Sequence, residues 1–470
     1  MLTATTNWKT AFRKLELQPV YRIVIEGYYR SFSNFDNGID DPWLVTIDDW
    51  TQNINDLEGG ADQETLSFAI QDHVAIGNTT GWLTKDMGAG EVFEGRMVKL
   101  YVGEASMSSV NDYLLIWQGY IDQVDSANSN LEYSFQCSDV TSKLSQTVFL
   151  TGDNGGQTSS DNIKTLKGHP LDIMLDILLN QLRDPISGQA LDPSLVDITK
   201  LTTYRDGPFQ GMEFFFHLNQ PPVALDFIKN QILKPLGGYL WISQGKVTVN
   251  FFYPIATVTP VQTLGEDDWL TIPSAEQTDM VNTVQFQFDK DDSGSSSSGN
   301  YLSTNTQNYG PSVKKYGLYN SHQVSSDGLR AGLQGYLISW LVAYLIFGRY
   351  GFKNLKFDKD ASEGLFSNIR LEPGDIVAVT HPLIPDRAAG QMGVTGKLFE
   401  VLGKKINFTD GLVTLTMIDA SYLSKFGFAE VAPDSEGDYT SVSSSDKAQF
   451  MFECGDDGRY SNGDAGNLLG

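Results

Sequence analysis

The sequence predicts a mainly β fold with α+β parts, made of two antiparallel β-barrel domains and mixed α/β domains. Three observations support this class. Phe, Tyr and Trp make up 11% of the residues, and aromatic side chains favour strands. Apolar and polar residues alternate in short runs, such as residues 65–71 (TLSFAIQ) and 412–417 (LVTLTM), as in strands with one buried face. Two other windows, residues 169–182 and 222–233, have helical spacing instead.

Length and charge limit the possible classes of function. At 470 residues the chain is long enough for about three domains, and 41% hydrophobic residues can form sizeable cores. It has 33 basic and 58 acidic residues, a net charge of −25, whereas specific nucleic-acid binding needs clustered Lys and Arg. Two interpretations remain for this acidity: it serves solubility, or it provides a surface that nucleic acid passes without binding.

The cysteines and the apolar runs indicate neither a disulfide framework nor a membrane segment. Cys137 and Cys454 lie far apart in the sequence, and Cys137 is expected to be a buried apolar residue. The N-terminus lacks the charged-then-apolar layout of a secretion signal. The one long apolar run, residues 336–347, is too short to span a bilayer, so we expect a buried helix and no membrane insertion by this chain.

Residues 1–150 are predicted to form the first barrel domain, without a convincing helix. The strand-like runs are residues 17–28, 43–50, 65–71, 94–102, 114–124 and 131–139. Gly88 and Gly90 are interpreted as a hairpin turn, because their spacing does not match a dinucleotide-binding loop.

Residues 151–260 are predicted to form a mixed α/β domain. It begins with a Gly/Ser/Asp-rich linker at residues 152–161. The helix predicted at residues 169–182 has Pro170 near its start, and the helix at residues 222–233 leads into a hairpin that turns at Gln244 and Gly245.

Residues 261–430 are predicted to form the second barrel domain, with a buried helix at residues 328–350. Residues 373–375 (PGD) form a turn, because Pro fixes φ and Gly allows positive φ. Residues 409–411 (TDG) carry an Asp-Gly hairpin signal. Between the strands of this stretch, residues 382–392 are predicted to form a long loop.

No catalytic or metal-binding signature is present, so we expect no enzymatic activity, no cofactor and no metal site. The sequence has no GxSxG, HExxH, P-loop or CxxC motif. The histidines have no metal-ligand spacing, and only His381, before Pro382, stands at a strand end; they are His73, His169, His217, His322 and His381. Adjacent acids such as Asp40 and Asp41 carry little information in a chain with 58 acidic residues.

Three groups of motifs, in this order, carry a family resemblance. The first is FEGRMVKLYVG at residues 93–103, followed by WQGYIDQV at residues 117–124. The second is the helix and hairpin at residues 222–252. The third joins VNTV at residues 281–284 and the helix at 328–350 to PGDIV at residues 373–377 and LVTLT. Together they resemble the baseplate-hub or tail-tip-hub family of tailed bacteriophages, which is related to the hubs of type VI secretion spikes.

The resemblance implies an architectural function without catalytic residues. Its barrels are similar to tail-tube subunits, and three copies form a pseudo-sixfold ring that closes the tail tube and opens for DNA. The implied partners are two further copies, a distal tail or tail-tube protein above, a central fibre or spike protein below, and passing DNA that is not bound specifically. The implied location is the tail tip or baseplate of a virion assembled in the host cytoplasm.

Contact residues follow from this expectation. Arg387, in the loop at residues 382–392, and Tyr460 are candidate interface residues. Tyr460 belongs to residues 431–470, a Ser/Asp/Gly-rich stretch that we interpret as an extended C-terminal arm. Acidic side chains such as Asp122 or Asp125 are expected to face the lumen and repel DNA phosphates.

Two alternatives stay open. A receptor- or glycan-binding tail protein would show an exposed aromatic cluster on one face. A cell-wall polysaccharide hydrolase would show two carboxylates that converge in a cleft.

Overall fold

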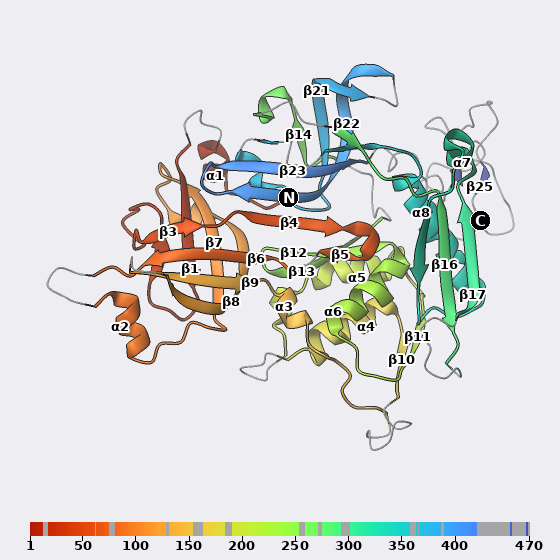
Figure 1. The fold of residues 1–470 in the computed structure, drawn as a ribbon, viewed down its shortest axis with the longest axis horizontal. Coiled ribbons are helices and arrows are strands. Elements are labelled where there is room, and N and C mark those ends of the chain that lie inside the picture. The colour runs from red at the N-terminus through yellow and green to blue at the C-terminus, as the bar shows by residue number, and fades with distance from the viewer. Residues whose placement is uncertain are drawn as a thin grey trace.

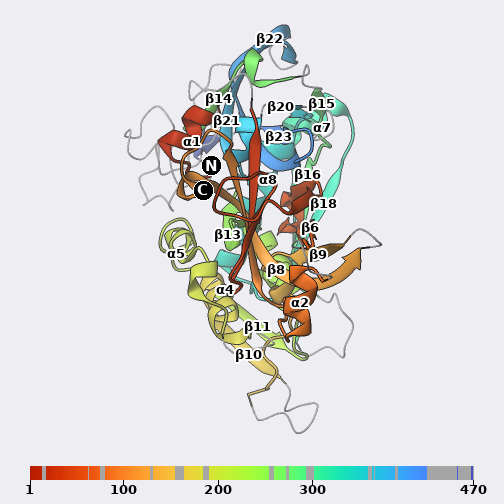
Figure 2. The same cartoon turned by 90° about the vertical axis from the view of Figure 1, so that its left-hand side faces the viewer.

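In the computed structural model the chain is mainly β, with helices packed beside several sheets, which confirms the predicted mainly β class with α+β parts (Figures 1 and 2). The described residues are 1–12, 17–61, 63–74, 80–127, 131–153, 163–183, 190–252, 259–270, 275–292, 301–357, 363–364, 366–386, 390–420, 452–453 and 467–468. The C-terminal arm therefore lies outside them, apart from two short paired strands, β24 (Phe452–Glu453) and β25 (Asn467–Leu468).

The first β body is a seven-stranded antiparallel sheet in the order β2-β1-β7-β8-β9-β6-β3. Its strands are β1 (Pro19–Ile25), β2 (Ser31–Ser33), β3 (Leu44–Ile47), β6 (Thr65–Gln71), β7 (Met97–Glu104), β8 (Leu114–Ala127) and β9 (Glu132–Ser138). The segment before β3 joins both ends of this path: Asp41 forms a bridge with Phe32 in β2, and the Gln71 N–H of β6 donates to the Trp43 carbonyl at 2.8 Å. The sheet therefore curls round into a ring, with Ile23, Leu100 and Phe135 buried inside.

Two helices flank this body, so the prediction of no helix in residues 1–150 is wrong. They are α1 (Thr6–Ala11) and α2 (Trp82–Gly88). A carboxylate from outside the helix caps α2: Asp72 accepts the Leu83 N–H at 2.7 Å and the Thr84 hydroxyl at 2.6 Å. The interpretation of Gly88 and Gly90 as a hairpin turn is also wrong, because Gly88 ends α2 and Gly90, at φ +99°, follows it.

The second sheet combines strands from the whole length of the chain. Its main path is β13-β12-β5-β4-β22-β23-β19-β15, and β21 pairs with both β14 and β22. The strands are β4 (Trp50–Asn55), β5 (Gly60–Ala61), β12 (Gly238–Ser243), β13 (Lys246–Phe251), β14 (Gln262–Leu264), β15 (Ala275–Gln277), β19 (Leu355–Phe357), β20 (Glu363–Gly364), β21 (Ile376–Asp386), β22 (Gln391–Asn407) and β23 (Leu412–Asp419). Strand β4 leaves the first body and pairs with β22 over Gly403–Ile406.

A close backbone approach fixes the turn after β4. Gly60 has φ +138°, and a Cβ placed there would lie 2.5 Å from the Leu240 carbonyl oxygen in β12. Gly60 is therefore required both by its conformation and by the distance to β12.

The stretch at residues 373–411 contains less loop than the sequence predicts. The turn at Gly374, with φ +84°, and the hairpin at Gly411, with φ +66°, are present. However, β21 continues to Asp386 and β22 begins at Gln391, so most of the predicted loop at residues 382–392 is strand. Two register irregularities between β21 and β22 interrupt the alternation that would have marked these residues as strand.

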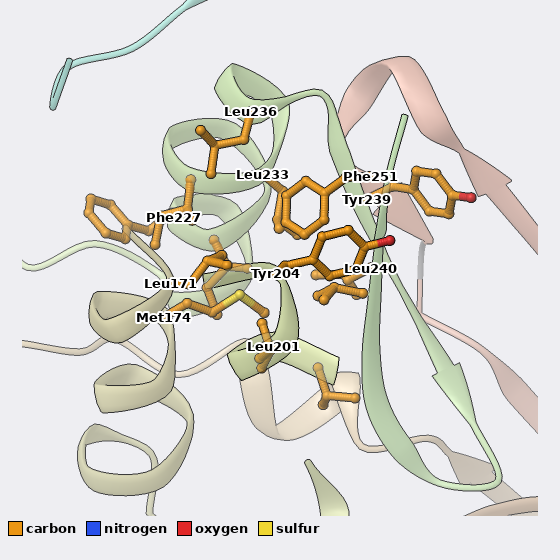
Figure 3. Close-up of a cluster of buried hydrophobic side chains, with 14 of the residues drawn as sticks. Leu171, Met174, Leu201, Tyr204, Phe227, Leu233, Leu236, Tyr239, Leu240 and Phe251 are labelled. Atoms are coloured by element: carbon orange, nitrogen blue, oxygen red, sulfur yellow. The ribbon is translucent and has the colours of Figure 1, made fainter. Parts of the chain in front are cut away.

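The middle of the chain forms helices that pack on the β12–β13 hairpin (Figure 3). The helices are α3 (Thr141–Leu144), α4 (Pro170–Asp176), α5 (Ile198–Asp206) and α6 (Ala224–Phe227), with β10 (Lys164–Gly168) paired to β11 (Phe214–Leu218). Both predicted helices are confirmed; each continues as a π-helical turn, at Ile177–Gln181 and Ile228–Leu233. Single 3₁₀ turns lie at Asp56–Glu58, Val110–Asp112, Pro193–Leu195, Lys234–Leu236, Glu266–Asp268 and Phe366–Arg370.

A third sheet lies at the far end of the molecule from the first body (Figure 1). It has the order β17-β16-β18, from β16 (Thr283–Lys290), β17 (Tyr301–Asn308) and β18 (Ser321–Ser325), with α7 (Gly310–Tyr316) between the last two. The predicted buried helix is α8 (Leu333–Tyr350), which packs against β16 and β17. One face of α8 stays accessible, because Tyr336 is 50% exposed whereas Leu345 is 3% exposed.

Two hydrophobic cores organise these parts. One core joins the first body to β19, β21, β22 and β23 of the second sheet. The other joins the middle helices, the β12–β13 hairpin, the third sheet and α8. The parts are thus interleaved, and the division at residues 150, 260 and 430 stays a prediction.

Candidate functional site

A buried ionic junction lies where four distant segments meet. Arg349, near the C-terminus of α8, has a side chain that is 1% exposed. Its Nε lies 2.6 Å from Asp56 Oδ2, in the turn between β4 and β5. Its guanidinium also contacts Glu400 of β22. A single cation therefore connects α8 to two parts of the second sheet that are far apart in the sequence, and both carboxylates depend on it.

Tyrosines complete the hydrogen bonding of the Arg349 junction. Tyr350 donates to both carboxylate oxygens of Asp56, at 2.7 and 2.8 Å. Tyr239 of β12 contacts Glu400 and accepts a hydrogen bond from Asn250 at 2.9 Å. Burial, followed by the adjacent carboxylates, raises the pKa of Tyr239 and Tyr350 well above the ordinary value, so both phenols stay protonated donors.

A second buried polar group lies at the seam between the first body and the second sheet. The Asp139 N–H donates to the Glu64 carbonyl at 3.0 Å, and the Glu64 N–H donates to the Asp139 carboxylate at 3.3 Å. Gln52 of β4 donates to Glu64 Oε1 at 2.8 Å and to the Ile242 carbonyl at 2.7 Å. Burial raises the pKa of Glu64, and it raises the pKa of Asp139 to about 6.

A lysine lies buried near the same seam. Lys404 of β22 is 1% exposed and donates to the carbonyls of Ile369 and Leu371 at 3.1 and 2.9 Å. Burial lowers its pKa, while nearby Glu372 and Glu64 oppose that change. Charged groups from both halves of the chain are thus buried inside the fold.

The expected lumen acids lie on the outer face of the first body. Asp122 and Asp125 stand on β8, where Asp122 is exposed and Asp125 is half-buried. Ser138 of the neighbouring strand donates to Asp122 at 2.9 Å, and Gln123 donates to both oxygens of Asp125 at 2.9 Å. The two acids are held on the barrel surface; that this surface faces a channel stays a prediction. Arg387 and Tyr460, the predicted interface residues, lie outside the described residues.

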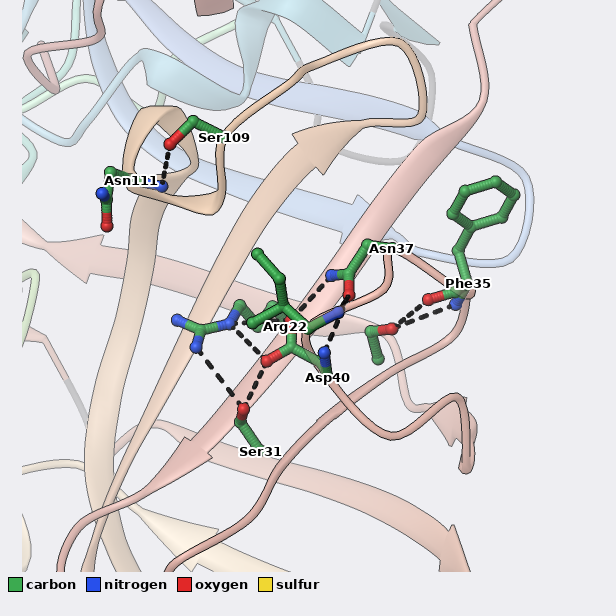
Figure 4. A network of polar contacts seen from close by, with 9 residues as sticks. Arg22, Ser31, Phe35, Asn37, Asp40, Ser109 and Asn111 are labelled. Carbon is green, nitrogen blue, oxygen red and sulfur yellow. Dashed lines mark hydrogen bonds and ion pairs between the residues drawn. The ribbon is translucent and has the colours of Figure 1, made fainter.

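Arginine side chains form ion pairs with both Asp40 and Asp41. Arg22 Nε donates to both oxygens of Asp40 at 2.8 and 2.9 Å, and Asn37 donates to Asp40 at 2.6 Å (Figure 4). Arg30 donates to Asp41 at 2.6 Å. These contacts hold the segment that closes the ring of the first body.

Nothing in the described ranges gathers groups for metal chemistry. No three His, Cys, Asp or Glu residues lie together there in a way that could hold a metal ion. His381 is buried and its Nδ1 accepts the Leu383 N–H at 3.2 Å, so it serves the local backbone. Within the same ranges, no helix is both long and apolar enough to cross a membrane.

An aromatic cluster surrounds Arg30 beside α2. The Arg30 guanidinium lies 4.4 Å from the Trp82 ring centre, 5.2 Å from that of Trp43 and 5.1 Å from that of Tyr29. His73 stacks on Trp43 with ring centres 4.8 Å apart. Tyr29 is 67% exposed, so the cluster presents an aromatic ring to solvent.

Sequence reasoning missed the Arg349 junction, although one signal was present. Arg349 is the only charged residue of α8, and a charge inside an apolar helix indicates a buried partner. Its partners Asp56 and Glu400 lie in ordinary strand and turn contexts, so only the fold identifies them.

Comparisons with known proteins concern the fold alone. No family model matches the chain, and no curated protein matches it. The fold is similar to that of the 43 kDa tail protein of prophage MuSo2 from Shewanella oneidensis, with a TM-score of 0.44 and 9% identity over 86% of this chain and 99% of that chain. A tail protein from Neisseria meningitidis MC58 gives a TM-score of 0.43 and 11% identity over 86% and 97% of the two chains. The prophage tail protein gp18 from Listeria monocytogenes EGD-e gives a TM-score of 0.41 and 10% identity over 85% of this chain and 94% of that chain.

Proposed function

We propose that this chain is a structural hub at the end of a phage-type tail. Three copies form a pseudo-sixfold ring that closes the tail tube, holds a central fibre or spike and lets DNA pass during ejection. In this proposal the chain acts without catalysis, and its site is the set of surfaces that it presents to neighbouring proteins.

The observation that carries the proposal is the path of β4. This strand leaves the ring of the first body and pairs directly with β22 in the second sheet, without a linker. The Arg349 junction fixes the same turn to α8 and β22. Two β bodies held rigidly within one chain suit a ring in which three copies supply six bodies around one channel.

Charge supports the role in DNA passage. With a net charge of −25, the chain repels phosphates instead of binding them. If Asp122 and Asp125 line the channel, replacing both with Lys introduces contacts that retain DNA. Particles carrying Asp122→Lys and Asp125→Lys should assemble but release DNA more slowly at low salt than at high salt. The control change Asp267→Lys, at an exposed position, should leave DNA release unchanged. Equal release from both variants would show that Asp122 and Asp125 do not line the channel.

Removing the chain from the producing cell tests the hub itself. Tails made without this chain should lack a closed tip. The defect should therefore appear in tail assembly, before any step of adsorption to the host. Complete tails that only fail to adsorb would favour a receptor-binding protein instead.

One observation favours a glycan-binding function as a second candidate, namely the aromatic cluster around Arg30. Exposed aromatic rings with fixed polar neighbours stack on sugar rings, and Asp86 holds the Tyr29 hydroxyl at 2.9 Å. Binding of host cell-wall polysaccharide by the whole chain, lost in Tyr29→Ala but kept in Tyr319→Ala, would support this function. No binding by the unsubstituted chain would dismiss it.

A further inference from the structure

The solvent face of the third sheet consists of uncharged polar side chains. We call this surface the neutral face; its residues are Thr283, Gln285, Gln287, Thr304, Thr306, Asn308, Ser321, Gln323 and Ser325. All are exposed or half-buried, whereas Val284, Phe286 and Val324 on the opposite face of the sheet are buried. The strand period of two thus places these Thr, Gln, Asn and Ser side chains on one side, with the exposed Leu302 on the same side at the end of β17.

Side-chain hydrogen bonds link neighbouring strands across the neutral face. Thr283 donates to Asn308 across β16 and β17 at 3.0 Å. Gln323 donates to Gln287 across β18 and β16 at 2.6 Å. The nearest charges along these strands, Asp289 and Lys290, lie at the end of β16, where Lys290 contacts Asp327. These charges thus lie at one end of the sheet and leave the centre of the face neutral.

Strand β17 also presents an open edge. In the described part of the chain it pairs with β16 alone, so its other edge meets no strand. Its eight residues, YLSTNTQN, contain no charge and no proline. Natural sheets usually protect a free edge with Lys, Pro or a bulge, because such an edge pairs readily with another chain. This edge has none of these protections.

Exposed apolar residues lie close to both ends of the neutral face. Leu302 of β17 is 69% exposed. It follows Tyr301, which pairs with Lys290 at the end of β16. Leu318 and Tyr319, just before β18, are 49% and 68% exposed. The scarcity of charge on this face and the exposed aromatic Tyr319 beside it agree with the depletion of charged residues and the enrichment of aromatic residues in protein contact surfaces.

We propose that the neutral face and the open edge of β17 form the contact with a second copy of this chain. The inference rests on the proposed ring and names one of its surfaces. A contact between identical chains of net charge −25 must avoid placing like charges opposite each other, and the neutral face meets this condition. The contact is heterologous, since a ring closes only when different surfaces of successive copies meet.

Charge placed on the neutral face tests the proposal. The variant Thr304→Asp with Thr306→Asp puts two acids on the exposed side of β17, without touching the buried side. Sedimentation of the full-length chain over a range of concentrations measures self-association. We expect the unsubstituted chain to associate and the double variant to associate at least about tenfold more weakly.

A control and a folding check separate the outcomes. Thr46→Asp, on the exposed side of β3, should leave association unchanged, and circular dichroism should show equal melting of all variants. If the unsubstituted chain and the double variant associate equally, the contact lies elsewhere and the ring survives. If the unsubstituted chain stays monomeric both alone and with its tail neighbours, the ring and the contact are both refuted.

Discussion

The Arg349 junction and the neutral face differ in their polar groups: the junction buries paired charges, whereas the neutral face exposes uncharged polar side chains. At the junction, charges from α8, the β4–β5 turn and β22 are buried and form ion pairs within one chain. On the neutral face, side chains carry no charge, and among the described strands none pairs with the outer edge of β17. Buried charges must be paired within the chain, so the junction stabilises the fold. A surface shared between acidic copies must avoid like charges, so the neutral face suits contact with a neighbouring copy.

The comparison predicts its largest effect inside the core that both regions share. Leu345 of α8 is 3% exposed, so Leu345→Asp places an unpaired carboxylate in this core. We expect no folded protein, as judged by near-ultraviolet circular dichroism and solubility. The control is Leu337→Asp on the accessible side of the same helix, where the side chain is 36% exposed and folding should survive. Folded Leu345→Asp would show that α8 is not a core helix.

Breaking the junction itself should have the next largest effect. Arg349→Met keeps the volume but leaves Asp56 and Glu400 buried without their cation, which costs about 3–5 kcal/mol. Chemical denaturation measures this loss. The matched change Lys167→Met removes an exposed ion pair with Glu213, at 3.2 Å, and should cost less than about 1 kcal/mol. Equal costs would mean that the junction contributes no more than a surface pair.

The turn after β4 should tolerate no side chain. Gly60→Ala forces a Cβ against the Leu240 carbonyl at 2.5 Å and strains a backbone with φ +138°, so we expect a loss of about 2–3 kcal/mol. Gly38→Ala, at φ +72° with open space around it, isolates the backbone strain and should cost about 1 kcal/mol. If both variants melt at the same temperature, β4 and β12 do not approach as closely as described.

The seam acids predict a smaller effect that depends on pH. Because burial raises the pKa of Asp139 from 3.8 to about 6, the folded state binds this proton more tightly than the unfolded state. The group therefore adds stability as pH falls from about 6 to 4, and this contribution is lost as pH rises through the same window. The stability of the unsubstituted chain relative to Asp139→Asn should grow by about 2–3 kcal/mol over that fall.

The control for the pH effect is an acid that stays in water. Asp267→Asn, at an exposed position in the Glu266–Asp268 turn, should show a nearly constant difference over the same pH range. A flat difference for Asp139→Asn would mean that this carboxyl is hydrated in the folded protein.

The sequence predicted local elements better than it predicted how they meet. Alternation located β6 and β23, and helical spacing located α4 and α6, because these signals lie within one element. Helix α2 was missed, since its cap, Asp72, comes from a different segment. The extended β21 and β22 were missed because register shifts disturb their alternation. The pairing of β4 with β22 joins residues more than three hundred positions apart, and no local pattern encodes it.

The candidate sites divide in the same way. Asp122 and Asp125 both lie on the surface of the first body, but strand alternation alone does not place them there, because they are three positions apart and β8 has a register irregularity between Ile121 and Gln123. The neutral face could not be read from the sequence, because it forms only when β16, β17 and β18 align in one sheet. Arg349 was visible as the lone charge of an apolar helix, whereas Asp56 and Glu400 became its partners only through the fold.

A cryo-electron microscopy reconstruction of the complete particle tests the hub most directly. The proposal predicts three copies of this chain in a ring at the end of the tail tube, with six β bodies around the channel and the neutral face of each copy covered by the next. A chain found singly or on a peripheral fibre would contradict the proposed hub. A ring in which β17 faces solvent would contradict the proposed contact.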